Sequence, residues 1–116
     1  MSRLSTHVLD VALGKPAAGV AVRLDVLPPA NEGGGTLILA SAVTDDDGRV
    51  VDLLEGAALE AGIYRLTFQT GAYFTATGRT SFYPRVQVTF EVTAPAQHHH
   101  VPLLLSPFGY STYRGS

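Results

Sequence analysis

Two stretches of the chain alternate apolar and polar residues with a period of two, and this pattern limits the fold more than any other feature. In residues 20–26 valine or leucine occupies every second position, and residues 86–92 alternate in the same way. Because successive side chains of a strand point to opposite faces, both stretches are predicted to be β-strands with one buried face. Further apolar runs of strand length lie at residues 4–9, 37–43, 63–68 and 100–105.

Turn-forming residues separate these runs, as expected for short strands that double back on one another. The breaks are Gly14-Lys15-Pro16, Pro28-Pro29, Gly33-Gly34-Gly35 and Asp47-Gly48. The only helical stretch suggested by the composition is short and rich in alanine and threonine, at residues 71–78. Seven or eight short strands with such turns predict an all-β fold, an antiparallel β-sandwich. The 116 residues form one domain, residues 1–116, with neither a linker nor a repeat.

Composition and charge exclude several classes of protein. The formal net charge is -2, so the chain has no basic field that would attract nucleic acid or an anionic membrane. It has no cysteine, which excludes disulfides, thiolate metal ligands and a cysteine nucleophile. His7 and Asp10 interrupt the N-terminal apolar run, and no stretch approaches the length of a membrane span. We therefore expect a cytoplasmic protein.

The last apolar run contains a proline and is apolar on both faces. Proline cannot donate a backbone hydrogen bond, so Pro102 indicates an edge strand or a position outside the hydrogen-bonded ladder. The apolar side chains around it fit two arrangements equally well. One face contacts another subunit, or both faces are covered within the core.

The four histidines occur in two places, at His7 and at residues 98–100. Histidine is the side chain best suited to move protons at neutral pH. In a strand, His98 and His100 share one face and His99 lies on the other. His7 could equally be structural, and the triplet could be a solvated loop or a weak metal site. Three histidines could in principle bind zinc, but no carboxylate has the spacing of a metal motif, so we predict no metal.

The segment Asp45-Asp46-Asp47-Gly48-Arg49 is a second candidate site. Asp-Gly predicts a tight hairpin turn. Arg49, directly after the turn, is either a solvated charge or a planar fork of donors for a carbonyl or anionic substrate. The three aspartates lack the spacing of a calcium-binding loop.

The C-terminal residues 98–116, which end in Tyr113-Arg114-Gly115-Ser116, closely resemble the C-terminal signature of the 5-hydroxyisourate hydrolases, a transthyretin-like family. Residues 4–10 and 44–49 resemble that family's N-terminal and middle motifs. The resemblance runs the full length of the chain. The terminal motif separates these enzymes from transthyretin, the hormone carrier with the same fold.

The resemblance implies a transthyretin-like sandwich of two four-stranded sheets with one short helix. It implies a homotetramer, a dimer of dimers, with active sites in a channel between dimers. The expected reaction is hydrolysis of 5-hydroxyisourate to 2-oxo-4-hydroxy-4-carboxy-5-ureidoimidazoline in urate degradation, without metal or organic cofactor. The alternatives are a non-catalytic carrier of a small aromatic ligand and an interaction module that has no site.

The resemblance also assigns residues. Its catalytic positions fall on His7, Arg49 and His100, and its substrate contacts on His7, Arg49, Tyr113 and Ser116. The two histidines would share the proton transfers, Arg49 would orient the substrate, and Tyr113 would close the site. The sequence does not decide which histidine is the base. It departs from the family at His99, where tyrosine or phenylalanine is usual, and we expect this change to alter packing more than chemistry.

Overall fold

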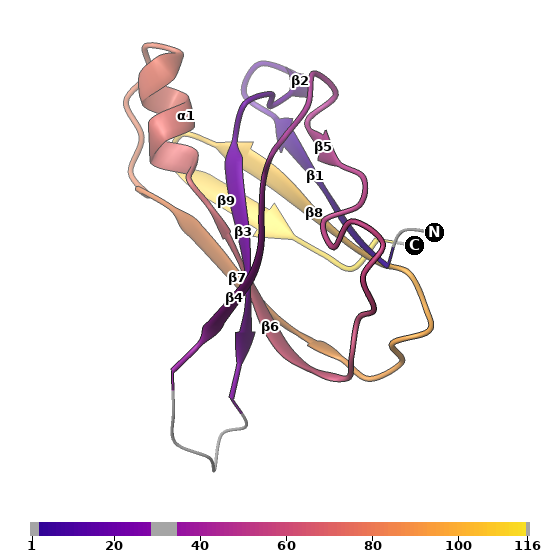
Figure 1. Cartoon of the computed structure of the whole chain (residues 1–116). Helices are drawn as coiled ribbons and strands as arrows, with labels where there is room; N and C mark the ends of the chain where they lie inside the picture. Colours follow the sequence, from indigo (N-terminus) through magenta and orange to yellow (C-terminus); the bar gives the residue numbers. More distant parts are fainter. Residues whose placement is uncertain (1–2, 29–34, 116) are drawn as a thin grey trace.

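Two β-sheets pack face to face, with one helix at an end of the sandwich (Figure 1). The structure is a computed structural model that describes residues 3–28 and 35–115. The first sheet contains β2 (Lys15–Pro16), β1 (Leu4–Asp10), β8 (His99–Ser106) and β9 (Gly109–Thr112) in that order, and β5 (Arg49–Val50) also pairs with β1. The second sheet has the order β4 (Leu37–Val43), β3 (Ala21–Leu27), β6 (Gly62–Phe68) and β7 (Val86–Val92).

The fold predicted from the sequence is confirmed, because each of the six apolar runs forms a strand and the two sheets make a sandwich. The predicted helix is α1 (Thr70–Ala76). The first sheet has five strands rather than the expected four, and three of them, β2, β5 and β9, lie outside the six apolar runs. One pair in it, β1 with β8, is parallel rather than antiparallel. Of the predicted turns, Pro29, Gly33 and Gly34 lie outside the described residues.

The core lies between the sheets and follows the alternation of the sequence. On β1, Leu4 and Val8 are fully buried, and on β3 Leu24 is fully buried as well. The proline in the last apolar run indicated either an edge strand or a position outside the hydrogen-bonded ladder. The edge strand is wrong, because β8, which contains Pro102, lies between β1 and β9. The first sheet therefore has an inner face in the core and an outer face that carries polar side chains. Among the residues that the structure describes, no helix is long and apolar enough to cross a membrane.

A buried carboxylate at the end of β1 connects the first sheet to α1. Asp10 is fully buried and accepts hydrogen bonds from the Tyr73 hydroxyl at 2.7 Å and the Arg79 guanidinium at 2.5 Å. The backbone N–H of Leu13 donates to its other oxygen at 3.1 Å. Burial by itself raises the pKa of Asp10, but the bonds from Arg79, Tyr73 and Leu13 and the charge of Arg79 outweigh it and lower that pKa. The ionised carboxylate thus stabilises the position of the helix.

Replacing this carboxylate should destabilise the protein. Asp10→Asn leaves the Arg79 guanidinium without its anion, so we expect the free energy of unfolding at pH 7 to fall by roughly 2–4 kcal/mol. Folding lowers the pKa of Asp10, so the ionised carboxylate contributes fully to the free energy of unfolding above the ordinary aspartate pKa. This contribution is lost as the pH falls through the pKa that Asp10 has in the folded protein. Urea denaturation from pH 7 to pH 3 measures both effects. Asp46→Asn, in an exposed turn, is the control, and an equal loss in both variants would contradict the assignment.

Candidate active site

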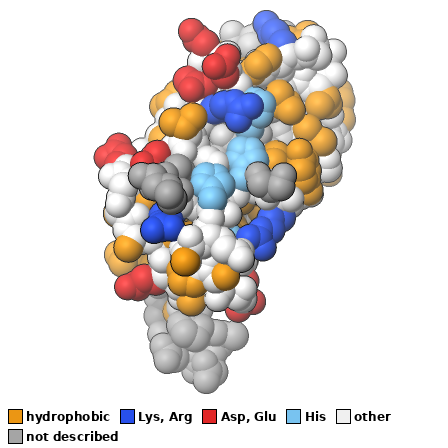
Figure 2. Space-filling model, turned by 90° about the vertical axis from the view of Figure 1, so that its right-hand side faces the viewer, with side chains coloured by type: hydrophobic (Ala, Val, Ile, Leu, Met, Phe, Trp, Pro, Cys, Tyr) orange, Lys and Arg blue, Asp and Glu red, His pale blue; other side chains and the backbone are white. Residues whose placement is uncertain are grey.

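Polar side chains gather on the outer face of the first sheet, where β1 and β8 run in parallel. The register places Ser5 beside His100, and β5 pairs His7 with Arg49. Since Leu4 and Val8 point into the core, the alternating residues Ser5 and His7 face outward. Figure 2 shows histidine side chains along this face, close to cationic side chains and bordered by apolar ones. The fold thus brings together His7, Arg49 and His100, the three positions that the resemblance assigns to catalysis.

The turn before β5 holds Arg49 in this position. Asp45 Oδ1 accepts hydrogen bonds from the backbone N–H groups of Asp47 and Arg49, both at 2.9 Å. Gly48 has a φ of +73°, and a Cβ there would lie 2.3 Å from the carbonyl oxygen of Val8. Only glycine combines this backbone conformation with so close an approach to β1. A turn at Asp47-Gly48 is therefore confirmed, but it is not the predicted hairpin, because β4 and β5 lie in different sheets. The turn holds the start of β5 against β1.

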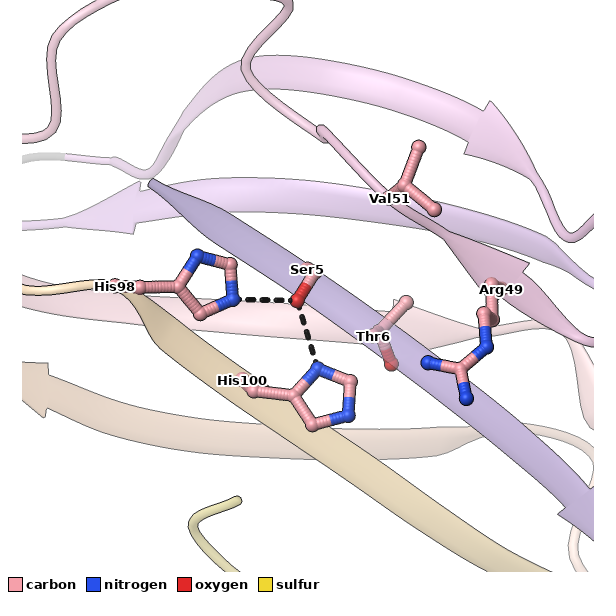
Figure 3. Close-up of a pocket in the computed structure, with 6 residues that line it drawn as sticks. All are labelled: Ser5, Thr6, Arg49, Val51, His98 and His100. Carbon is pink, nitrogen blue, oxygen red and sulfur yellow. Dashed lines mark hydrogen bonds between the residues drawn. The ribbon is translucent and has the colours of Figure 1, made fainter. Parts of the chain in front are cut away.

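A small cavity opens beside these residues (Figure 3). Its volume is about 250 Å³, and its lining consists of Ser5, Thr6, Arg49, Val51, His98 and His100. The Ser5 Oγ lies 2.8 Å from His98 Nε2 and 2.7 Å from His100 Nδ1. The cavity therefore presents two imidazoles and a guanidinium, groups that can exchange protons and stabilise negative charge.

The environment of His100 favours a neutral ring, and a contact with the backbone orients the ring of His7. Burial lowers the pKa of His100, and the charges of His98, Arg49 and His7 lower it further. His100 is therefore neutral at pH 7. The Nε2 of His7 lies 2.8 Å from the carbonyl oxygen of Asp47. Because a carbonyl can only accept, this nitrogen carries a hydrogen, so in the neutral ring Nδ1 of His7 would be the acceptor.

The C-terminal segment folds back onto His100. The backbone N–H of Gly115 donates to the His100 carbonyl at 2.8 Å. A Cβ on Gly115 would lie 2.5 Å from the ring carbon Cδ2 of His100, so the ring and the chain end pack without room for a side chain. The Arg114 guanidinium donates to Gln97 Oε1 at 3.1 Å. Gly115 and Arg114 thus anchor the chain end beside the site.

Of the assigned residues that the structure describes, His7 and Tyr113 do not line this cavity. Tyr113 is 56% exposed and lines a second cavity of about 330 Å³ between the edges of the sheets, together with His99, His100 and Arg114, so His100 borders both cavities. Ser116 lies outside the described residues. Conversely, Ser5 and His98 line the first cavity although the sequence assigned them no role. Ser5 lies in a strand motif of the N-terminal signature, but only the pairing of β1 with β8 places it between two histidines.

His99 points to the opposite face of β8, as the alternation predicted. It is 5% exposed, and its Nδ1 has no hydrogen-bond partner among the described residues. Burial lowers its pKa, and the charges of Arg114 and His98 act in the same direction. His99 is thus a packing residue that is neutral at pH 7. Within residues 3–28 and 35–115, no group of three or more histidine or acidic side chains is arranged to hold a metal ion.

Comparison with known proteins connects this site to one family. A family model described as HIUase/Transthyretin family matches residues 4–115. A 5-hydroxyisourate hydrolase of Caulobacter vibrioides is 49% identical over 120 residues and covers 100% of both chains. The structure of Klebsiella pneumoniae 5-hydroxyisourate hydrolase superposes with a TM-score of 0.84 at 44% identity, covering 99% of this chain and 100% of the other. Sea bream transthyretin in complex with thyroxine gives a TM-score of 0.87 at 35% identity, covering 97% and 94% of the two chains.

The buried imidazole of His99 should make stability depend on pH. Its pKa is lowered in the folded state, so the unfolded chain binds the proton more tightly, and stability falls as the pH drops below the ordinary histidine value of about 6.5. His99→Phe removes this linkage and the unsatisfied nitrogen, so we expect the variant to be about 1 kcal/mol more stable at pH 7 and to lose less stability at pH 5. Chemical denaturation at fixed protein concentration compares the two proteins. Equal pH dependence would contradict the assignment.

Proposed function

The chain belongs to the HIUase/transthyretin family, and from that membership we propose that it hydrolyses 5-hydroxyisourate to 2-oxo-4-hydroxy-4-carboxy-5-ureidoimidazoline, a step of urate degradation. The observation that carries this proposal is the cavity in which the neutral imidazole of His100 lies with the Arg49 guanidinium. Both groups belong to motifs that the sequence shares with the hydrolases.

Ring opening of a cyclic amide needs an activated water molecule and stabilisation of the developing oxyanion. We assign proton transfer to His100 and His7, and a positioned base of this kind accelerates a reaction by about 10²–10⁴-fold. Arg49 presents a planar fork of donors that would orient the substrate and stabilise negative charge, an effect of roughly 3–4 kcal/mol per donor. Tyr113 and Ser116 remain proposed substrate contacts. The reaction as written uses neither a metal nor an organic cofactor.

We propose that the working form is a homotetramer, a dimer of dimers, with sites between dimers. The cavity of about 250 Å³ is smaller than a usual ligand pocket and lies on the outer face of the sheet, where a second subunit could enclose it. Large apolar side chains are exposed in the two loops at one end of this sheet, Val11, Leu13 and Phe108, and at the start of β9, Tyr110. Exposed apolar patches mark contact surfaces.

A cytoplasmic location stays a prediction.

Transthyretin of sea bream, whose structure contains thyroxine, makes carriage of a small aromatic ligand the second candidate. The lining of the cavity argues against it. A carrier of aromatic ligands needs mainly apolar walls, whereas this cavity is lined by two imidazoles, a guanidinium and two hydroxyls. Such groups favour chemistry on a polar substrate over retention of an apolar one.

Removal of either assigned histidine should abolish most of the activity. His7→Ala and His100→Ala should each lower kcat/KM by about 10²–10⁴-fold, measured as the ultraviolet decay of freshly made 5-hydroxyisourate. As the pH of the wild-type assay is lowered, kcat/KM should stay constant past pH 6.5, the ordinary histidine pKa. It should fall only at still lower pH, where His100 becomes protonated, because the pKa of His100 is lowered. His99→Phe, which removes an imidazole from the other face, is the control. Full activity in both alanine variants would refute the assignment.

The assembly can be tested by light scattering. The wild type should have four times the mass of the 12.3 kDa chain. Phe108→Glu places a charge in the exposed apolar loops and should dissociate the tetramer and lower activity, because a charge is costly to bury in an interface. Thr80→Glu, an exposed position outside those loops, is the matched control. A stable monomer with full activity would contradict a site shared between subunits.

A further inference from the structure

Ser5 occupies the point at which the two outward histidines of the C-terminal segment meet β1. Its hydroxyl contacts His98 Nε2 at 2.8 Å and His100 Nδ1 at 2.7 Å, and the residue is only 8% exposed. We propose that Ser5 is a positioning residue for the ring-opening reaction. It accepts a hydrogen bond from Nδ1–H of His100 and donates one to Nε2 of His98, which leaves Nε2 of His100 free to take the proton. This inference rests on the proposed function.

The chemistry of one hydroxyl couples the two rings. A serine hydroxyl has a single hydrogen and can donate one hydrogen bond while it accepts others. With both rings neutral, Ser5 therefore donates to one histidine and accepts from the other. Either His100 carries its hydrogen on Nδ1 and offers Nε2 as a base, or it carries the hydrogen on Nε2 and cannot act as a base there. The state of His98 and the state of His100 are thus linked through Ser5.

The position of Arg49 selects the first arrangement. A guanidinium has only donors and a permanent positive charge. Arg49 lines the same cavity, and its charge is one of those that lower the pKa of His100. Figure 3 shows Nε2 of His100 on the far side of the ring from Ser5, on the side where the guanidinium lies. A lone pair at this nitrogen is favoured over an N–H that would point its positive end towards the cation.

The sheet holds Ser5 in place for this role. The pairing of β1 with β8 runs without interruption over seven residue pairs, with Leu4 opposite His99 and Ser5 opposite His100. A shift of one residue would turn Ser5 into the core, so the register is strongly fixed. Because Ser5 is nearly buried, water has little access to replace its hydroxyl. The hydrogen bonds to both histidines therefore follow from backbone pairing rather than from a mobile side chain.

The position of the hydrogen can be read directly by NMR of protein labelled with ¹⁵N in histidine, without substrate. At a pH where His100 is neutral, the wild type should show hydrogen on Nδ1 and none on Nε2. Ser5→Ala should shift His100 towards the form with hydrogen on Nε2, and Ser5→Thr, which keeps a hydroxyl, should preserve the wild-type form. Ser41→Ala, the same substitution on exposed β4, is the matched control. Hydrogen on Nε2 in the wild type would overturn the proposal even if Ser5→Ala does not fold.

Kinetics then separates this inference from the proposed function. Ser5→Ala should lower kcat for 5-hydroxyisourate by about 10–10²-fold, part of the contribution of a correctly protonated base, with a smaller change in KM and a shifted pH profile. Ser5→Thr should recover most of the rate. An unchanged kcat and pH profile in Ser5→Ala would overturn the role of Ser5 while the function stands. A wild type with the expected hydrogen on Nδ1 but no turnover would instead refute the function.

Discussion

The parallel pairing of β1 with β8 is the contact on which the rest of the site depends. It joins segments about 95 residues apart in sequence, since Ser5 bonds to His100 across that separation. The inward side chains of the two strands, such as Leu4 and Leu103, are fully buried. Burial of the inner face therefore fixes the register of the two strands. That register places His7 and His100 on the outer face of the sheet. β5 adds Arg49 to the same sheet, and Gly115 closes against His100 from the chain end.

Burial has opposite consequences for neighbouring histidines of one strand. It lowers the pKa of both His99 and His100. His99 faces the interior with a nitrogen that has no partner among the described residues, so its burial weakens the fold at low pH. His100 faces the cavity, where the same neutral state leaves it able to accept a proton, as its proposed role as a base requires. The direction of the side chain, set by the pleat, decides whether a neutral imidazole is a packing group or a reactive one.

Much of the fold followed from local pattern. The alternation at residues 20–26 and 86–92 predicted strands that became β3 and β7, and Asp47-Gly48 predicted the turn that positions Arg49. Other features did not follow, among them the strand β9 (Gly109–Thr112), which no predicted run covers. The strands Lys15–Pro16 and Arg49–Val50 are too short to show an alternation of apolar and polar residues. The parallel direction of β1 and β8 cannot be read from the residues of either strand. The edge position that Pro102 indicated was wrong, because the neighbours of a strand in a sheet depend on tertiary packing and not on the residues of that strand.

The sequence by itself determined which residues can do chemistry and which faces are apolar, because residue type and period are local properties of the chain. It placed His98 and His100 on one face and His99 on the other, and its terminal motif identified the family. Only the tertiary structure decided that Ser5 lies between two imidazoles and that Tyr113 lies in a second cavity, which His100 also lines, rather than in the cavity of Ser5 and Arg49. The physical reason is that contacts between distant segments depend on sheet order and strand direction. Those are settled by the packing of the whole core, not by any one stretch of residues.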